Sequence, residues 1–306
     1  MAHIGAFVPG RRARSSATIN VIGKDKSGVI AKVCTFLYRQ GGNVEELDQQ
    51  VTHGLFTMQL EISWPRRRLS EDRVRRGLES LAKKLDMTIQ FRPHRGGVAK
   101  PRLGLLVTTE KHCLDRVVKD CRSGRIPATV ALVASNRPDL EDHVKRLGIP
   151  FLHMDDRDKP AHEAAILAEL DRHEVDYVVL ARYMKILSPN FVWRYPNRIV
   201  NIHPSLLPSF PGASAYRQAH RHGVRIAGVT AHFVTMNLDE GPIITQRSFE
   251  VQARDSVRDV QQKGRRFEGA ALCEAVKLLA EGRLDVHWGR VEIRARSKNR
   301  GPALRA

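Results

Sequence analysis

The segment NRIVNIHPSLLPSFPG, residues 197–212, holds the densest group of reactive side-chain types in the sequence. Asn201 and His203 lie two residues apart in an apolar run that is typical of a β-strand, so both should project from the same face of the strand. Pro204 should end the strand, because proline has no N–H to donate to a neighbouring strand. The amide and the imidazole are therefore predicted to lie at the carboxyl end of a strand, where open α/β sheets bind ligands.

A carboxylate comes from a second motif, NLDEGP, which follows the apolar segment TAHFV. Asp239 lies in this turn, and the fold can bring it to the same strand end. Together the three side chains suit attack on a formyl carbonyl. Asn201 and a protonated His203 can polarise the carbonyl oxygen, and Asp239 can hold an attacking water or amine and accept its proton. The alternative is that Asn201 only caps a strand end and His203 is a hydrogen-bonded surface histidine. The neighbouring SLLPSFPG and LDEGP segments favour catalysis.

The elements that must position these residues form an alternating pattern over residues 102–295. Short apolar runs alternate with amphipathic helices, which indicates a mostly parallel sheet covered on both faces. Near the end, GVRIAGVTAHFV and GPIITQRSFEV are predicted strands joined by a tight acidic turn. A helix should follow from Ser256 to about Gly282.

Residues 17–93 carry a different pattern, with the order βαββαβ of a ferredoxin-like domain. Gly28 precedes the first predicted helix, and Ser70 is the expected N-cap of the second. The Pro/Gly/basic stretch of residues 94–101 is the predicted linker, and residues 296–306 form a basic tail. The chain of 306 residues is thus expected to contain two domains.

The composition narrows the function classes. Hydrophobic residues make up 42% of the chain, and no run approaches the ~18 apolar residues of a membrane-spanning helix. The N-terminus is a poor secretory signal. The four cysteines lie far apart without a Cys-x-x-Cys spacing, so we expect reduced thiols, a cytoplasmic location and no metal site.

The formal net charge of +18 allows two interpretations. Clustered Lys and Arg side chains would indicate nucleic-acid binding, whereas a diffuse basic surface would attract acidic metabolites. Aromatic residues are only 6% of the chain, and the basic residues are spread along it. We therefore predict no nucleic-acid partner and no membrane partner; a polyglutamylated cofactor is a simpler acidic ligand.

Four segments taken together, LARYMKILSP, NIHPSLLPSFPGA, TAHFV and LDEGPII, resemble the folate-dependent formyltransferase and deformylase superfamily. The whole chain is similar to the formyltetrahydrofolate deformylase family, which joins an N-terminal ACT domain to a Rossmann-like formyltransferase domain. The resemblance implies hydrolysis of 10-formyltetrahydrofolate to formate and tetrahydrofolate, supplying purine biosynthesis and balancing one-carbon pools, without a metal. It gives the catalytic places to Asn201, His203 and Asp239. It also implies that the pterin is bound by Arg182, Tyr183, Met184, Lys185, Ile186, Leu187, Val234 and Leu238.

Two sequence features point to different formyl acceptors, water or an amine. The chain has NIHPSLLPSFPG where deformylases usually have NIHHSFLP, and in this it is closer to glycinamide ribonucleotide formyltransferase. That transferase carries a Gly-rich loop after its first strand, where backbone N–H groups hold a phosphate. This chain has VTTEKHC there, with no glycine between Leu105 and Cys121. We predict water as the acceptor; the alternative is formyl transfer to an amine.

The ACT resemblance implies an amino-acid effector near KDKSG and Asn43, and a homo-oligomer. Gly28 can equally be only a tight entry to the helix. A catalytically silent metabolite sensor is a third class of function. The complete set of Asn201, His203 and Asp239 argues against it.

Overall fold

The computed structural model describes residues 14–52, 54–65, 70–93, 100–287 and 289–295. The chain divides into an N-terminal unit, residues 1–99, and a C-terminal unit, residues 100–306. Residues 94–99 of the predicted linker and the predicted tail lie outside the described residues, so the domain boundaries stay predictions.

The N-terminal unit has the predicted βαββαβ order. Its sheet is ordered β2-β3-β1-β4, with antiparallel neighbours. Its elements are β1 (Arg14–Lys24), α1 (Val29–Arg39), β2 (Asn43–Thr52), β3 (Leu55–Pro65), α2 (Glu71–Leu85) and β4 (Met87–Pro93).

Local sequence explains both helix starts in this unit. Gly28 precedes α1 with φ +82°, a left-handed conformation that favours glycine. Ser70 caps α2 by accepting a hydrogen bond from the Arg73 backbone N–H at 3.4 Å. Apolar side chains of both helices are buried in one core with the strands.

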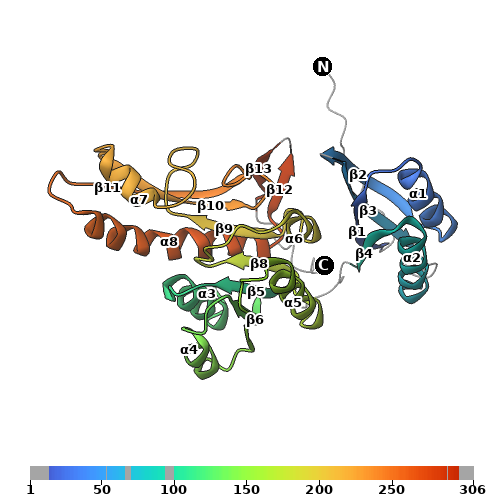
Figure 1. Cartoon of the computed structure of the whole chain (residues 1–306), viewed down its shortest axis with the longest axis horizontal. Coiled ribbons are helices and arrows are strands. Elements are labelled where there is room, and N and C mark those ends of the chain that lie inside the picture. The colour runs from blue at the N-terminus through green and yellow to red at the C-terminus, as the bar shows by residue number, and fades with distance from the viewer. Residues whose placement is uncertain (1–13, 53, 66–69, 94–99, 288, 296–306) are drawn as a thin grey trace, which may run out of the picture. The chain divides into compact units, whose positions relative to one another are not determined.

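The C-terminal unit is built on a seven-stranded sheet of order β11-β10-β9-β8-β5-β6-β7 (Figure 1). Strands β9, β8, β5, β6 and β7 are parallel neighbours, whereas β10 is antiparallel to both β9 and β11. This confirms the mostly parallel sheet predicted from the sequence. The elements are β5 (Arg102–Val107), α3 (His112–Arg122), β6 (Thr129–Ser135), α4 (Glu141–Arg146), β7 (Phe151–His153), α5 (Lys159–Arg172), β8 (Tyr177–Leu180), α6 (Pro189–Arg194), β9 (Ile199–His203), α7 (Ala215–Arg221), β10 (Ile226–Phe233), β11 (Ile243–Glu250), α8 (Val257–Ala280), β12 (Leu284–His287) and β13 (Arg290–Ile293).

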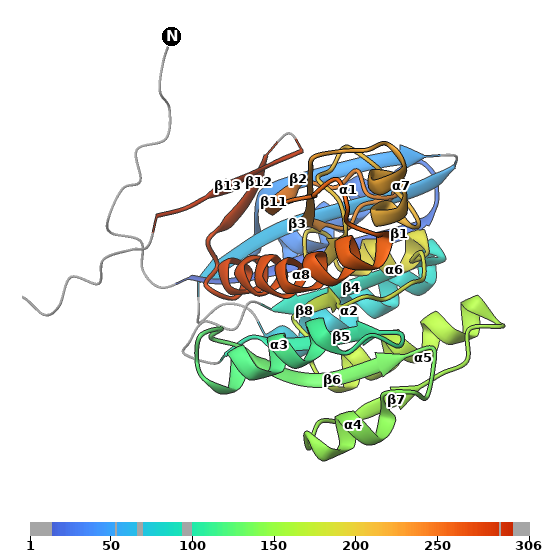
Figure 2. The same ribbon diagram turned by 90° about the vertical axis from the view of Figure 1, so that its left-hand side faces the viewer.

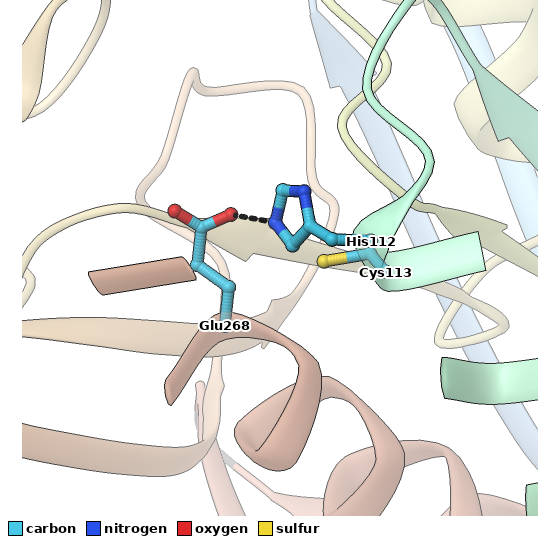
Figure 3. A group of neighbouring side chains, drawn as sticks. All are labelled: His112, Cys113 and Glu268. Atoms are coloured by element: carbon cyan, nitrogen blue, oxygen red, sulfur yellow. Dashed lines mark hydrogen bonds and ion pairs between the residues drawn. The ribbon is translucent and has the colours of Figure 1, made fainter. Parts of the chain in front are cut away.

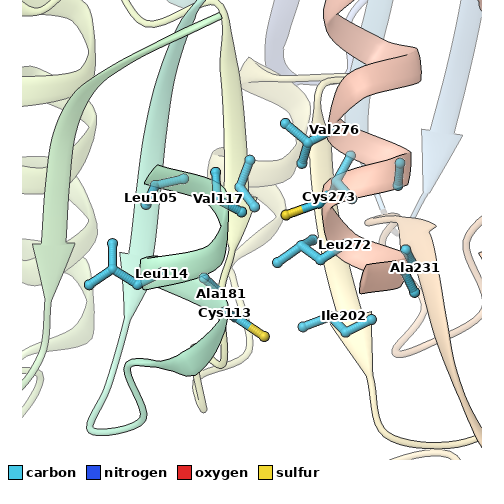
Figure 4. Packing of buried hydrophobic residues seen from close by; sticks show 14 of the residues in the cluster. Leu105, Cys113, Leu114, Val117, Ala181, Ile202, Ala231, Leu272, Cys273 and Val276 are labelled. Carbon is cyan, nitrogen blue, oxygen red and sulfur yellow. The ribbon is translucent and has the colours of Figure 1, made fainter. Parts of the chain in front are cut away.

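Helices cover both faces of this sheet. One buried cluster joins α3 and α8 to the strands, and Figure 4 shows Val117 of α3 and Leu272 of α8 within it. A second cluster joins α5 and α6 to the opposite face. At Gly104 an added Cβ would lie 2.4 Å from Leu170 of α5, so this glycine permits the close approach of helix and strand. Figure 2 shows α8 as the longest helix of the unit.

One detail differs from the sequence interpretation. The strands β10 and β11 are joined by residues 234–242 rather than by a tight turn, because this segment runs along β9: the Val234 N–H donates to the Ile199 carbonyl at 2.9 Å, and Asp239 lies 3.3 Å from His203. The chain after α8 forms an antiparallel hairpin of β12 and β13. Within the described residues, no helix has both the length and the apolar character needed to cross a membrane.

Candidate active site

A cleft of about 400 Å³ lies at the carboxyl end of β9. Strand β9 ends at His203, directly before Pro204, as the proline predicts. The cleft is lined by the ends of β8, β9 and β10, by the segments that follow them and by one side chain of α8, Gln261. Every catalytic and pterin-binding residue proposed from the sequence lines this cleft.

Asn201 is oriented by a histidine on the neighbouring strand. His232 is the cross-strand partner of Asn201 in the β9–β10 register, and its Nε2 lies 3.2 Å from the Asn201 Nδ2. The His232 Nδ1–H donates to the Phe233 carbonyl at 2.8 Å, which leaves Nε2 to accept from the amide. Burial lowers the pKa of His232, although the nearby Asp239 and the Phe233 carbonyl act against that shift. One N–H of Asn201 is thus held by a neutral imidazole.

His203 lies between two oxygen acceptors. Its Nε2 is 3.0 Å from the Phe210 carbonyl, and its Nδ1 is 3.3 Å from Oδ2 of Asp239. Both oxygens can only accept, so the ring serves both only when each nitrogen carries a proton. His203 is 4% exposed, and water therefore screens this pair weakly.

The turn that carries Asp239 is tightly constrained. Asp239 has φ +57°, an uncommon conformation outside glycine, and its Oδ2 accepts a 2.8 Å hydrogen bond from the Gly212 backbone N–H. At Gly241 an added Cβ would lie 1.7 Å from the Phe233 carbonyl oxygen. Only glycine therefore lets the turn return against the end of β10, which places the carboxylate beside both histidines.

Thr230 of β10 holds the loop that follows His203 by two hydrogen bonds. The Thr230 hydroxyl donates to the Ser205 carbonyl at 2.7 Å and accepts from the Leu207 backbone N–H at 3.0 Å. The side-chain amide of Gln246 donates to the Leu207 carbonyl at 3.0 Å. This bracing sets the position of the Phe210 carbonyl and the Gly212 N–H, which hold His203 and Asp239.

The proposed pterin-binding residues split into two kinds. Met184, Ile186 and Leu238 expose 58%, 62% and 52% of their surface, so they give the cleft an apolar rim. The two charged residues of this set are already paired. The Arg182 Nη2 lies 3.2 Å from the Glu110 Oε1, and Lys185 forms an ion pair with Asp156. The apolar side chains and the backbone of this segment are therefore the parts that remain available to a flat ring.

A second polar cluster lies behind Arg182 and is centred on Glu268 of α8, which is 1% exposed. Its carboxylate lies 2.8 Å from the His112 Nε2 (Figure 3), accepts from the Tyr216 hydroxyl at 2.7 Å, and lies 3.5 Å from the Arg182 Nε. Burial acts to raise the pKa of Glu268, but the hydrogen bond from His112 and the charge of Arg182 hold it below its ordinary value.

Among the described residues, His112, Cys113 and Glu268 form a group with metal-ligand spacing (Figure 3). Burial, with Glu268 nearby, raises the pKa of the Cys113 thiol well above its ordinary value, which disfavours the thiolate that binds metals. The guanidinium of Arg182 occupies the neighbourhood of Glu268 as well. The contacts fit a closed hydrogen-bond network better than a metal site.

The turn after β5 contributes side chains to this network. The Glu110 carboxylate lies 3.4 Å from the His112 Nδ1 and 3.2 Å from the Arg265 Nε. An acidic side chain thus lies where the transferase family carries its glycines.

Comparison with known proteins covers both units. The formyl transferase family model matches residues 102–276, and an ACT domain model matches residues 16–92. Formyltetrahydrofolate deformylase of Synechocystis sp. is 39% identical over 282 residues, which are 91% of this chain and 98% of that protein. The protein is a member of the formyltetrahydrofolate deformylase family.

Solved structures agree at the level of the fold. A formyltetrahydrofolate deformylase from Pseudomonas syringae aligns with a TM-score of 0.63 and 32% identity, covering 93% of this chain and 96% of that one. Glycinamide ribonucleotide transformylase 1 from Symbiobacterium toebii has a TM-score of 0.63 and 41% identity, but it covers only 65% of this chain. The alignment with the deformylase therefore includes both units of this chain, whereas the alignment with the transformylase leaves about a third of this chain unmatched.

The sequence assigned no catalytic part to two of these side chains. From the sequence alone, His232, two residues after Thr230 in a predicted strand, is expected to border the site and only to pack or hydrogen-bond there; the structure gives it the bond to Asn201. Its position one strand away from Asn201 becomes visible only with the sheet register. Glu268 carries no motif at all; a buried acidic residue inside the apolar face of α8 is the signal that would have found it.

Proposed function

We propose that this cleft hydrolyses 10-formyltetrahydrofolate to formate and tetrahydrofolate. The observation that carries the proposal is the convergence of Asn201, His203 and Asp239 at the carboxyl end of β9, in a cleft with an apolar rim. The family membership supports the same reaction.

In the proposed mechanism, Asp239 accepts a proton from a water molecule as the water oxygen bonds to the formyl carbon. The carbonyl oxygen gains negative charge, which the second N–H of Asn201 and the charge of protonated His203 stabilise. The tetrahedral intermediate then breaks its C–N bond as the substrate nitrogen takes up the proton that Asp239 accepted, and the formic acid released gives up its remaining proton to solvent and leaves as formate. His232 orients Asn201 throughout by accepting its other N–H.

Binding of the folate rests on the apolar rim. Met184, Ile186 and Leu238 offer exposed apolar surface that a flat pterin ring can cover. Covering such surface contributes about 25 cal/mol per Å². Arg182 contributes its backbone and alkyl chain, because its guanidinium is engaged by Glu110 and Glu268.

The choice of water over an amine is supported by the turn at Glu110. A phosphorylated amine would need free backbone N–H groups or unpaired cations at that turn; the turn has no glycine, and the guanidinium groups of Arg182 and Arg265 beside it are both paired with the Glu110 carboxylate. The Pro204-to-Gly212 loop, which is similar to the transferase motif, is engaged in holding Asp239 and His203.

The test is formate release by the purified chain from 10-formyltetrahydrofolate without any amine. We expect formate and tetrahydrofolate in equal amounts, and no change on addition of glycinamide ribonucleotide. Formylation of that amine with negligible formate in its absence would contradict the proposal and establish the transferase alternative.

Further proposals concern the whole chain. We propose a domain division at residues 17–93 and 102–295, an amino-acid effector at the ACT domain, a homo-oligomer and a cytoplasmic location. The four cysteines are free, which supports a reducing compartment. The reaction would supply formate for purine biosynthesis.

A further inference from the structure

Two buried polar residues of α5 hold the segment that lines the cleft. His162 and Glu163 are 2% and 5% exposed, and neither lines the cleft. Both contact residues between β8 and α6, where residues 181–187 form no helix or strand. An irregular segment takes its shape from such contacts, because it has no ladder of backbone hydrogen bonds.

The contacts of His162 determine its hydrogen-bonding roles. Its Nδ1 lies 2.8 Å from the Met154 carbonyl, which can only accept, so Nδ1 carries the proton. Its Nε2 is then an acceptor for the Tyr183 hydroxyl at 2.6 Å. Burial raises the pKa of Tyr183, which keeps the phenol protonated as the donor. Tyr183 lines the cleft, so His162 acts on the cleft through one defined hydrogen bond.

Glu163 fixes the other end of the segment. Its Oε1 accepts from the Ser188 backbone N–H at 2.8 Å, and Ser188 is the N-cap of α6. Between these ends, the Met184 backbone N–H donates to the Thr108 hydroxyl at 3.1 Å. The segment is thus held at both ends by consecutive residues of one helix.

We propose that His162 is a positioning residue for the folate substrate, acting through Tyr183 on the apolar rim of the cleft. The inference rests on the proposed function, because it takes the cleft as the folate site. Loss of the imidazole acceptor leaves the Tyr183 hydroxyl buried without a partner, which is unfavourable. The segment must then move to hydrate the hydroxyl, and the rim loses its fit to the ring.

The test compares His162→Phe, Tyr183→Phe and the double variant by steady-state formate release. We expect His162→Phe to raise KM about 10-fold with kcat within about 2-fold, because the affected contacts serve binding. Tyr183→Phe alone should raise KM by less than His162→Phe does, because it leaves only the His162 Nε2 unpaired and no buried hydroxyl, and adding it to His162→Phe should lower KM from the value of His162→Phe, because neither unpaired group then remains.

Controls separate positioning from general stability. His162→Gln keeps an acceptor oxygen and should stay near the wild-type KM, and His173→Gln, at the far end of α5, should not change KM. If His162→Phe does not fold, His162→Asn, which is too short to reach Tyr183, replaces it with the same expectation. A lower Tm with unchanged KM, or a KM defect that Tyr183→Phe leaves in place, would overturn the proposal.

Calorimetric titration with tetrahydrofolate tests the positioning role of His162 separately from the proposed hydrolysis. Wild-type binding with no formate release would sink the proposed reaction while leaving the positioning role testable through Kd. We expect Kd to follow the same order across the variants as KM. Equal Kd values for wild type and His162→Phe would overturn the positioning role.

Discussion

Two carboxylates of the C-terminal unit, those of Asp239 and Glu268, have side chains that are 6% and 1% exposed, and both lie beside histidines. Glu268 has short contacts to His112 and Tyr216, at 2.8 and 2.7 Å, and it does not line the cleft. Asp239 lines the cleft, and its distances to His203 and His232 are 3.3 and 3.8 Å.

The difference shows how one set of residue types serves two purposes. The Glu268 oxygens are occupied by strong donors, so that carboxylate fixes structure and has no capacity left for a reaction. Both donors to Asp239, the Gly212 N–H and the His203 ring, contact Oδ2, whereas Oδ1 lies no closer than 3.8 Å to His232, so one oxygen of this cleft-lining carboxylate can still accept a proton. A buried acid with free capacity at a cleft is suited to proton transfer, whereas a saturated one is suited to holding helices in place.

The largest effect on stability is expected from Glu268→Ala. Removing this carboxylate takes away one of the two acidic partners of Arg182 and the acceptor of the buried Tyr216 hydroxyl, which should lower the free energy of unfolding by about 3–5 kcal/mol. Glu274→Ala is the matched control, because Glu274 lies on the same helix in an exposed pair with Arg247 and should cost less than about 1 kcal/mol. Equal losses in denaturant titrations of the two variants would remove the structural role of Glu268.

The complementary change, Asp239→Asn, should act on turnover rather than stability. Loss of the proton acceptor should lower kcat at least ~100-fold, with Tm and folate binding close to wild type. Glu240→Gln, at the exposed neighbouring position, should leave kcat unchanged. Turnover of Asp239→Asn within a few-fold of wild type would exclude Asp239 from the mechanism.

A smaller effect should appear in the pH dependence of stability. The pKa of Glu268 is held below its ordinary value of 4.5, so its contribution is present above pH 4.5 and is lost as the pH falls through the folded-state pKa. Glu268→Gln should therefore be less stable than wild type by about 1–3 kcal/mol at neutral pH. The gap should narrow below pH 4.5 in thermal unfolding; a gap that is constant with pH would mean that the carboxylate charge contributes nothing.

The sequence predicted the parts of the site that depend on local periodicity. The two-residue spacing of Asn201 and His203, with Pro204 after them, was enough to place both at a strand end. The helix after Ser256 was also predictable, because Ser256 and Asp259 form a capping box at its start.

The remaining features depend on contacts between distant parts of the chain. His232 meets Asn201 through the pairing of β9 with β10, and His112 meets Glu268 across 156 positions of sequence. The sequence analysis predicted a tight turn between β10 and β11, which is wrong. Residues 234–242 must be long enough to bring Asp239 to His203 of β9, and the Gly-Pro pair at their end does not indicate that length. Local sequence patterns do not indicate which residues far apart in the chain come into contact.

The central claim is that water, activated at Asp239, is the formyl acceptor. Turnover of 10-formyltetrahydrofolate in ¹⁸O-labelled water tests it directly, with mass spectrometry of the formate and a control for exchange of free formate. The account predicts one labelled oxygen per formate for the wild type, at a rate that falls at least ~100-fold in Asp239→Asn. Unlabelled formate, or a formyl group recovered on an added amine instead, would contradict it.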